Sequence, residues 1–357
     1  MKRMVHNIAV VGAGVIGMSC ALEMARRGAR VTIFDPEPAG FGTSWAAAGM
    51  IAPAFEAAGG AARHPRLLDL CLESGRLWPQ FVADLKSDTR IDTGLVSRPT
   101  LVATITDDDR AAMDGLMAAL LKKSVPFDLL TAAEMVAIDP SLSPDIASGI
   151  ALPTDMQVDN RRLVLALRAA LVKYEVEFIA RRIRDHSADR AMLARFDATV
   201  WSRGHVETGL QATVRGQAFS VAPYAGAPRH VVRRGAHYIV PKRDRLVIGA
   251  TSEPGELSTT TDARSIARLR QEISELVPSL ANQPELEQWV GFRPSTSDHA
   301  PILGQTSDHD FVATGHYRNG ILLAPVTAKV IADAVLDGTS SDLADAFSTK
   351  RFAAGPA

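Results

Sequence analysis

The sequence has 357 residues, 46% hydrophobic and 22% charged, enough for about two domains with a large buried core. Its net charge of −1 excludes the strongly basic composition of nucleic-acid-binding proteins. Its two cysteines, Cys20 and Cys71, provide neither a disulfide framework nor a zinc site, which fits a reducing compartment. We interpret the apolar stretch after Lys2 and Arg3 as a strand and a helix, because a glycine turn and then charges interrupt it. No later run reaches the ~18 apolar residues of a membrane span, so a cytoplasmic location is expected.

The first strong signal is the glycine turn at residues 12–17, Gly-Ala-Gly-Val-Ile-Gly. A short apolar run at residues 8–11 precedes it and suits a buried parallel strand, and a helical pattern follows it. In this context Gly12 permits the tight turn, Gly14 lets a pyrophosphate approach the backbone, and Gly17 lets helix and strand pack closely. The N–H groups at the helix start, including those of Val15 and Ile16, favour phosphate.

The next predicted strand, residues 30–34, ends at Asp35, which Pro36 follows. An acid at this place accepts hydrogen bonds from ribose hydroxyls and repels a 2′-phosphate. Turn and acid together predict a dinucleotide site; the alternative is a glycine turn with an incidental aspartate.

Residues 40–53 are small and apolar, with neither helical nor strand periodicity. Such a segment lets the backbone lie against a planar ligand, and Thr43 and Ser44 offer hydroxyl groups; a flexible connection is the alternative. A helical pattern covers residues 66–86. Residues 100–106 alternate like a strand, and Asp107 or Asp108 is the expected cap of the next helix.

Further along, Asp159 is expected to cap a helix, strands are expected at 176–179, near Ile183 and at 197–201, and short strands recur in 216–252. Asp262 caps a predicted helix that stops before Pro278. A strand at 311–314 and a helix from Pro325 to Gly338 complete the pattern. The fold class is therefore α/β with an added antiparallel sheet.

The order of five segments identifies a family resemblance. The chain contains these segments in succession: the glycine turn with Asp35, then TSWAAAGMIAP, then YIVP followed by LVIGATSE, then GFRPSTSDHAPILG and finally GHYRNGILLAP. Together they resemble the glycine oxidase group of the D-amino-acid oxidase superfamily of FAD-dependent amine oxidases, which includes the thiamine-pathway glycine oxidases. The resemblance implies a Rossmann-like FAD-binding domain (1–85, 150–215 and 292–357) and a discontinuous antiparallel-sheet substrate domain (86–149 and 216–291).

The same resemblance implies non-covalent FAD, because related sarcosine oxidases attach flavin through a late cysteine and this chain has none. The glycine turn would hold the ADP part, Ile183 would lie near the adenine, and the helix at Pro325 would point at the flavin. The remaining residues implied for FAD are Asp35, Pro36, Thr43, Ser44, Ala48, Gly49, Met50, His316, Tyr317, Arg318, Asn319, Gly320, Ile321 and Leu322.

For the substrate, Arg293 resembles the arginine that grips the carboxylate, which a planar guanidinium meets with two parallel hydrogen bonds. Its alternative is a structural salt bridge. Tyr238 matches a tyrosine of the substrate pocket, and its alternative is a half-buried sheet tyrosine. Arg318 is expected at substrate or flavin. No side-chain base is assigned, and no metal site is expected.

Two departures from the family pattern are visible. Residues 201–205, Trp-Ser-Arg-Gly-His, stand where relatives have small residues, which puts FAD packing there in question. Ser252 replaces a larger apolar residue, so a wider or more polar pocket is expected.

The implied function is oxidative deamination of glycine or a small N-substituted or D-amino acid by hydride transfer to FAD. The products are a 2-oxo acid, ammonia or an amine, and hydrogen peroxide, with oxygen the expected acceptor. Two alternatives stay open: a dehydrogenase that passes electrons to a quinone or partner protein, and a non-catalytic FAD-binding subunit. A homo-oligomer is compatible with the sequence.

Overall fold

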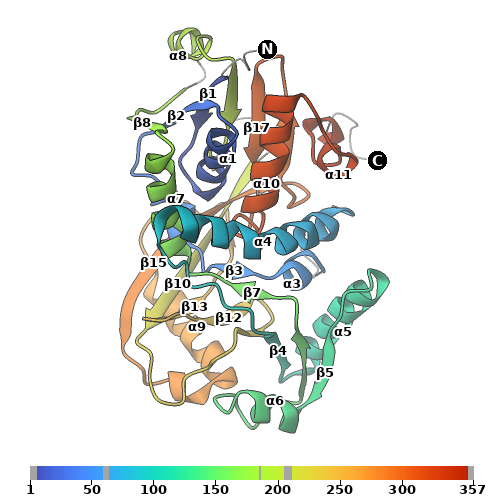
Figure 1. Ribbon diagram of the computed structural model, residues 1–357. Helices are drawn as coiled ribbons and strands as arrows, with labels where there is room; N and C mark the ends of the chain where they lie inside the picture. Colours follow the sequence, from blue (N-terminus) through green and yellow to red (C-terminus); the bar gives the residue numbers. More distant parts are fainter. Residues whose placement is uncertain (1–5, 59–63, 185, 205–210, 353–357) are drawn as a thin grey trace.

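The computed structural model describes residues 6–58, 64–184, 186–204 and 211–352. These residues form two stacked layers, each built on one large sheet, and the described part of the chain begins and ends in the upper layer (Figure 1). The upper sheet has six strands in the order β16-β17-β9-β1-β2-β8. They are β1 (Asn7–Val11), β2 (Arg30–Asp35), β8 (Glu177–Ala180), β9 (Ala198–Trp201), β16 (Ile302–Gln305) and β17 (Asp310–Thr314).

Strand β1 lies inside this sheet because its apolar side chains are buried on both faces. It pairs in parallel with β2 through Val10 and Ile33, and with β9 through Val10 and Val200. Helix α1 (Val15–Arg26) packs against α7 (Asn160–Lys173) and α10 (Ala324–Ala332) to form the main core. The other α-helices of this layer are α4 (Leu67–Thr89), α8 (Ser187–Leu193) and α11 (Asp342–Asp345).

The lower sheet has nine strands, in the order β14-β10-β13-β12-β11-β4-β6-β5, with β15 paired to β10. They are β4 (Thr100–Thr104), β5 (Asp128–Thr131), β6 (Ser148–Leu152), β10 (Gln211–Val221), β11 (Val232–Arg234), β12 (His237–Pro241), β13 (Leu246–Gly249), β14 (Glu253–Pro254) and β15 (Glu285–Thr296). Its helices are α5 (Asp107–Lys122), α6 (Ala132–Ile138) and α9 (Ala263–Leu276).

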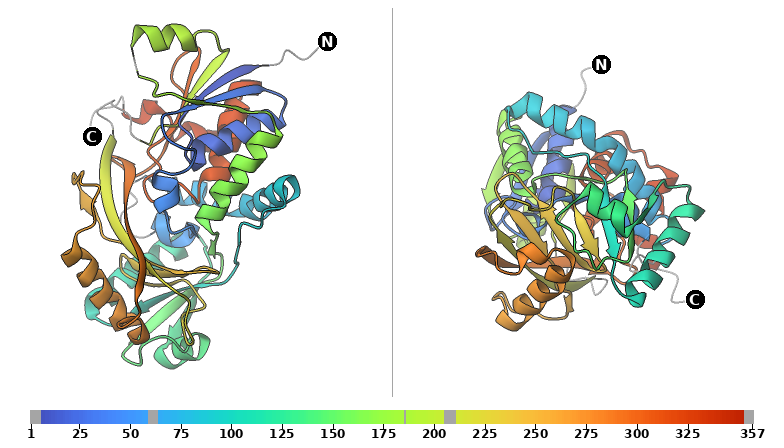
Figure 2. Two further views of the ribbon diagram at one scale, coloured as in Figure 1. Left: turned by 90° about the vertical axis from the view of Figure 1, so that its left-hand side faces the viewer. Right: turned by 90° about the horizontal axis from the view of Figure 1, so that it is seen from below.

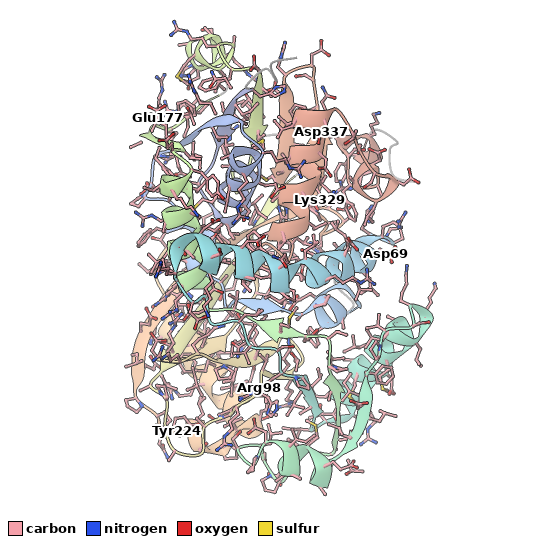
Figure 3. The ribbon with its side chains drawn as sticks, in the orientation of Figure 1. Asp69, Arg98, Glu177, Tyr224, Lys329 and Asp337 are labelled. Atoms are coloured by element: carbon pink, nitrogen blue, oxygen red, sulfur yellow. The ribbon has the colours of Figure 1, made fainter. Side chains whose placement is uncertain are left out.

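The two longest strands, β10 and β15, connect the layers. They run antiparallel with Gly216 opposite Gly291 and Val214 opposite Arg293, and Figure 2 shows them rising from the lower layer toward the upper one. Between the layers lie α2 (Thr43–Ala46), the strand pair β3 (Met50–Ile51) and β7 (Met156–Gln157), and α3 (Pro53–Ala58). Figure 3 marks the extent of the molecule, with Glu177, Lys329 and Asp337 on the upper layer and Arg98 and Tyr224 on the lower.

The structure confirms several sequence predictions and corrects others. The side chain of Asp159 caps α7, and that of Asp262 caps α9, which ends before Pro278 as expected. Helix α5 is capped by Thr106, not by Asp107 or Asp108, because the Thr106 hydroxyl accepts from the N–H of Asp109.

The strand expected near Ile183 is also absent from the structure: Ile183 is buried in a loop against the sheet. Strand β15 was not predicted, since its exposed and half-buried polar side chains hide its alternation. The domain boundaries proposed at 150, 215 and 292 fall within β6, β10 and β15, and the division stays a proposal. Across the described ranges, no helix combines the length and apolar character needed to cross a bilayer.

Candidate active site

The glycine turn lies at the carboxyl end of β1, between the strand and α1. Gly12 has a φ of +115°, and a Cβ there would lie 2.7 Å from the carbonyl oxygen of Ser202. A Cβ at Gly17 would lie 1.9 Å from the carbonyl oxygen of Gly12, so this turn requires glycine at both positions. At Gly14 the nearest atom is the Ser44 hydroxyl oxygen at 3.5 Å, which leaves that face of the turn open for a ligand.

Asp35 and Ser44 fix this turn from two sides. Asp35 accepts hydrogen bonds from the N–H of Ala13 at 2.7 Å and of Glu37 at 2.9 Å, one on each carboxylate oxygen. Each oxygen retains capacity for another donor, such as a ribose hydroxyl. The Ser44 hydroxyl accepts from the N–H of Val15 at 2.9 Å, which ties the segment after residue 40 to the start of α1.

An open cavity lies between the two layers. Many of the predicted site residues meet there, from the segment after the glycine turn, from strands β12 and β15 and from the turn before α10. Those that line it are Val15, Thr43, Ser44, Ala48, Gly49, Met50, Tyr238, Arg293, Tyr317, Arg318, Asn319, Gly320 and Ile321. The other residues predicted to bind FAD do not line this cavity: they are residues 12, 14, 16, 17, 35, 36, 183, 316 and 322.

Arg293 projects from β15 into this cavity over Gly216 of the paired strand. A Cβ at Gly216 would lie 2.3 Å from Nη2 of Arg293, so only glycine leaves room for this guanidinium. Its Nη1 donates to the carbonyl oxygens of Thr251 at 3.2 Å and Arg215 at 3.5 Å. Within the described part of the chain, no carboxylate forms an ion pair with Arg293, so the alternative of a structural salt bridge finds no support.

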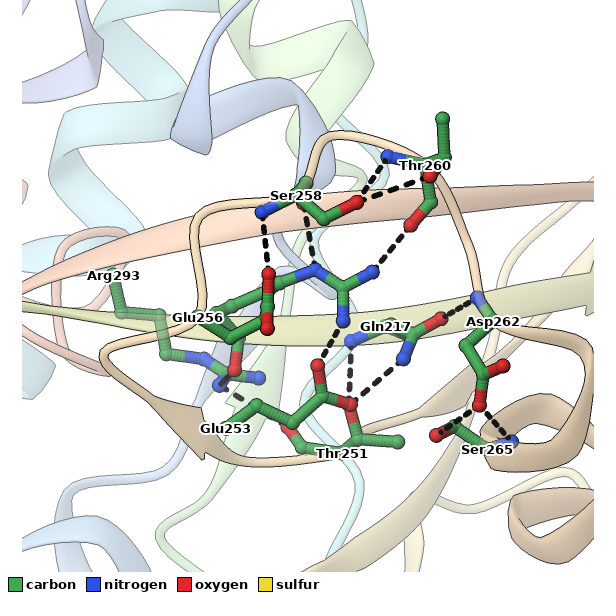
Figure 4. A network of polar contacts seen from close by, with 10 residues as sticks. Gln217, Thr251, Glu253, Glu256, Ser258, Thr260, Asp262, Ser265 and Arg293 are labelled. Carbon is green, nitrogen blue, oxygen red and sulfur yellow. Dashed lines mark hydrogen bonds and ion pairs between the residues drawn. The ribbon is translucent and has the colours of Figure 1, made fainter.

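The carbonyl groups that hold Arg293 belong to a polar network (Figure 4). Arg215 forms an ion pair with Glu253 and donates to the carbonyl oxygen of Ser258 at 2.7 Å. Gln217 donates its side-chain amide to Glu253 at 2.7 Å, and its backbone N–H donates to the Thr251 hydroxyl at 2.8 Å. Burial lowers the pKa of Arg293 from its ordinary value, because desolvation disfavours its charge.

Tyr238 is positioned in the same way, by a glycine on the neighbouring strand. It lies on β12 opposite Gly249 of β13, and a Cβ at Gly249 would lie 2.5 Å from the Tyr238 hydroxyl. The residue is 7% exposed, so this tyrosine is buried rather than half-buried, and it lines the cavity together with Arg293.

A buried carboxylate that the sequence analysis missed also lines the cavity. Glu56 of α3 accepts from Nη2 of Arg233 at 2.8 Å and forms an ion pair with Nε of Arg318 at 3.2 Å. Burial opposes its ionisation, but the charges of Arg318 and Arg233 prevail and lower the pKa of Glu56. Conversely, Glu56 raises the pKa of Arg318. A single glutamate among small residues carries no sequence signal for this role.

The turn before α10 places Asn319 on the cavity wall and His316 behind it. Asn319 is buried, and its side-chain oxygen has no hydrogen-bond partner in the part of the chain that the structure describes. His316 lies 3.0 Å from the Thr327 hydroxyl oxygen, and burial lowers its pKa to about 3. Burial therefore favours the neutral form of the His316 side chain.

The structure clarifies the two departures from the family pattern. Ser202 packs beneath the glycine turn and donates to the carbonyl oxygen of Gly12 at 3.0 Å. Arg203 lies over the Trp201 ring and donates to the carbonyl oxygen of Ile183 at 3.2 Å, while residue 205 lies outside the described residues. Ser252 is exposed and does not line the cavity, so the expectation that it widens the pocket is wrong.

The residues present fit a flavin dinucleotide. The open face at Gly14, the acceptor capacity of Asp35 and the helix start at Val15 suit an ADP group. The unpartnered oxygen of Asn319 and the small residues 46–49 suit a flat, polar ring in the cavity. The fold and this site define a dinucleotide-binding oxidoreductase.

The chain belongs to the FAD dependent oxidoreductase family, whose model matches residues 7–334. It is 33% identical to a glycine oxidase from Geobacillus kaustophilus, over 92% of this chain and 93% of that protein. It is 32% identical to the bifunctional protein ThiO/ThiG of Trichormus variabilis, over 98% of this chain but 55% of that longer protein. The crystal structure of the Geobacillus kaustophilus glycine oxidase superimposes with a TM-score of 0.85, at 31% identity over 96% of this chain and 98% of that one.

Proposed function

We propose that this protein is an FAD-dependent amino-acid oxidase that acts on glycine or a small amino acid. The observation that carries the proposal is Arg293, a half-buried guanidinium facing the cavity with only carbonyl partners within the described residues. A partly desolvated cation without an ionic partner has lost hydration, and a substrate carboxylate would compensate for that loss with two parallel hydrogen bonds. The family membership and the similarity to glycine oxidases support the same substrate class.

The remaining residues then have defined tasks. The glycine turn, Asp35 and Pro36 would hold the ADP part of FAD, with Ile183 near its adenine. Residues 43–44, 48–50 and 316–322 would surround the ring end. Tyr238 would hydrogen-bond the substrate carboxylate beside Arg293. These assignments rest on the positions of the residues in the fold and on the family resemblance.

When bound, FAD supplies an acceptor for the hydride that leaves the substrate's Cα. The chain's own contribution is orientation, because Arg293 fixes the carboxylate and the cavity wall fixes the ring. The substrate amine must be neutral when the hydride leaves. Water then converts the imino acid to a 2-oxo acid and ammonia or an amine.

For the electron acceptor we propose oxygen, which gives hydrogen peroxide. Stoichiometric peroxide formation in air with glycine, sarcosine or a D-amino acid would support an oxidase. Flavin reduction by the same amino acids with slow reoxidation in air would support a dehydrogenase instead.

The test of the proposal is Arg293→Ala in the FAD-loaded protein. We expect FAD to remain bound while kcat/KM for glycine falls on the order of a hundredfold, since a charged hydrogen-bonded contact is lost. Arg293→Lys should recover only part of this loss, because a lysine cannot make the planar paired contact. Unchanged flavin reduction in Arg293→Ala would contradict the assignment.

A further inference from the structure

Among the described residues that line the cavity, Glu56 is the one acidic residue, and Arg293 and Arg318 are the two cationic residues. Its side chain is 8% exposed, so its charge is largely removed from water. A buried carboxylate at the wall of a substrate cavity needs an explanation, because its desolvation costs several kcal/mol unless partners compensate.

Two arginines hold the Glu56 carboxylate, one on each oxygen. Nη2 of Arg233 lies 2.8 Å from Oε1, and Nε of Arg318 lies 3.2 Å from Oε2. A carboxylate has about four acceptor positions, so two further positions remain beyond these contacts. Glu56 can therefore accept a hydrogen bond from a ligand without releasing either arginine.

The support beneath Glu56 is closely packed. Arg233 is fully buried, its guanidinium carbon lies 3.5 Å from the centre of the Phe55 ring, and it pairs with Tyr238 across β11 and β12. Glu56 and Tyr238 thus share one buried arginine. A shift of Glu56 would also disturb the wall that carries Tyr238.

We propose that Glu56 is a substrate-binding residue that accepts a hydrogen bond from the amino group of the substrate and holds Arg318 at the cavity wall. The inference rests on the proposed function, which places the substrate carboxylate at Arg293. An amino acid carries its amine next to its carboxylate. A cavity that offers the Arg293 cation to the carboxylate is therefore complementary to the whole amino acid if it also offers the Glu56 anion to the amine. Arg318 and Arg233 lower the pKa of Glu56 and so make its carboxylate a weak base, and the ammonium proton therefore leaves to solvent.

This role has a specific consequence for the pH dependence. An anion beside the amine stabilises the ammonium form and raises the pKa of the bound amine. Removal of that charge should move the acidic limb of the flavin reduction rate to lower pH. A purely structural role of Glu56 would not shift that limb.

The experiment compares two ligands of similar shape in the FAD-loaded protein and in Glu56→Gln. Propionate has a carboxylate and a methyl group, and its binding is measured from the change in flavin absorbance. Glycine has an amine in place of the methyl group, and its affinity is measured from the anaerobic reduction rate at increasing concentration. In Glu56→Gln we expect glycine affinity to fall on the order of tenfold and propionate affinity to change less than about twofold.

Two further variants serve as controls. Glu56→Asp keeps the charge and should keep the preference for glycine over propionate within about threefold of the unmodified protein. Asp109→Asn removes a carboxylate that pairs with Arg234, next to Arg233 on β11, but that does not line the cavity. It should leave both affinities unchanged.

If Glu56→Gln weakened the binding of glycine and of propionate equally, Glu56 would act only through the arginines, and the proposal would be overturned. An unchanged affinity for both ligands would overturn it as well. Failure of the proposed function would be visible earlier, as an unmodified protein whose bound flavin no amino acid reduces.

Discussion

The guanidinium of Arg293, on β15, lies over Gly216 of the paired strand β10 and occupies the space that a side chain at Gly216 would fill. The distance of 2.3 Å from a Cβ at Gly216 to Nη2 of Arg293 is too short for both to remain in place. Because the contact involves the far end of a flexible side chain, an added methyl group would displace Arg293 rather than the backbone. This pair therefore allows the position of Arg293 to be tested without changing its charge.

In Gly216→Ala we expect FAD binding and thermal stability to be retained while KM for glycine rises by on the order of tenfold. The matched control is Gly115→Ala in α5, where a Cβ would meet nothing within 4 Å. Steady-state kinetics and a thermal melt of both variants measure the difference. Wild-type kinetics in Gly216→Ala would mean that Arg293 does not bind the substrate.

Gly14 and Gly17 should respond differently to the same substitution. A Cβ at Gly14 has only an ordinary contact at 3.5 Å within the protein, so Gly14→Ala should fold normally but bind FAD more weakly. A Cβ at Gly17 collides with the backbone of Gly12 at 1.9 Å, so Gly17→Ala should lose stability as well. Titration of the apoprotein with FAD, together with urea unfolding without FAD, separates the two effects. Unweakened FAD binding by Gly14→Ala would argue against a phosphate site at this turn.

We expect the stability of the protein to depend on pH through Asp155. It is fully buried, and burial raises its pKa to about 7. Because its pKa is raised on folding, its stabilising contribution is intact at pH values below the ordinary aspartate pKa and is lost as the pH rises toward 7. Asp155→Asn should therefore gain free energy of unfolding relative to the unmodified protein as the pH rises from about 4 to 7, by on the order of 1–4 kcal/mol. Urea unfolding at several pH values measures this difference, and parallel profiles would contradict it.

FAD should be bound without a covalent link to cysteine. Cys20 and Cys71 are both buried, neither lines the cavity, and burial raises the pKa of both thiols. Acid precipitation should leave the yellow colour in the supernatant. A yellow pellet would contradict this prediction.

Much of the cofactor end could be predicted from sequence, because it depends on local patterns. The glycine turn, its flanking strand and helix, and Asp35 lie within one stretch of chain, and their geometry follows from backbone sterics. The segment at residues 43–50 could be assigned through family resemblance, and the structure adds its link to α1 through Ser44.

The substrate end was less predictable, because its contacts join distant segments. Arg293 was identified by resemblance. The roles of Gly216 and Gly249, which make room for Arg293 and Tyr238, could be recognised only from the register of the paired strands. Glu56 was missed because its partners, Arg233 and Arg318, are far away in sequence. Strand β15 itself was missed because its side chains are mostly exposed or half-buried.

The central claim is that an amino acid bound at Arg293 reduces a flavin held beside the glycine turn. Anaerobic mixing of the FAD-loaded protein with glycine, sarcosine and D-alanine, followed by visible absorbance, tests it most directly. We expect at least one of them to bleach the flavin in the unmodified protein and none to do so at the same concentration in Arg293→Ala, with FAD still bound. A protein that takes up no FAD, or whose flavin stays oxidised with every small amino acid, would contradict the account.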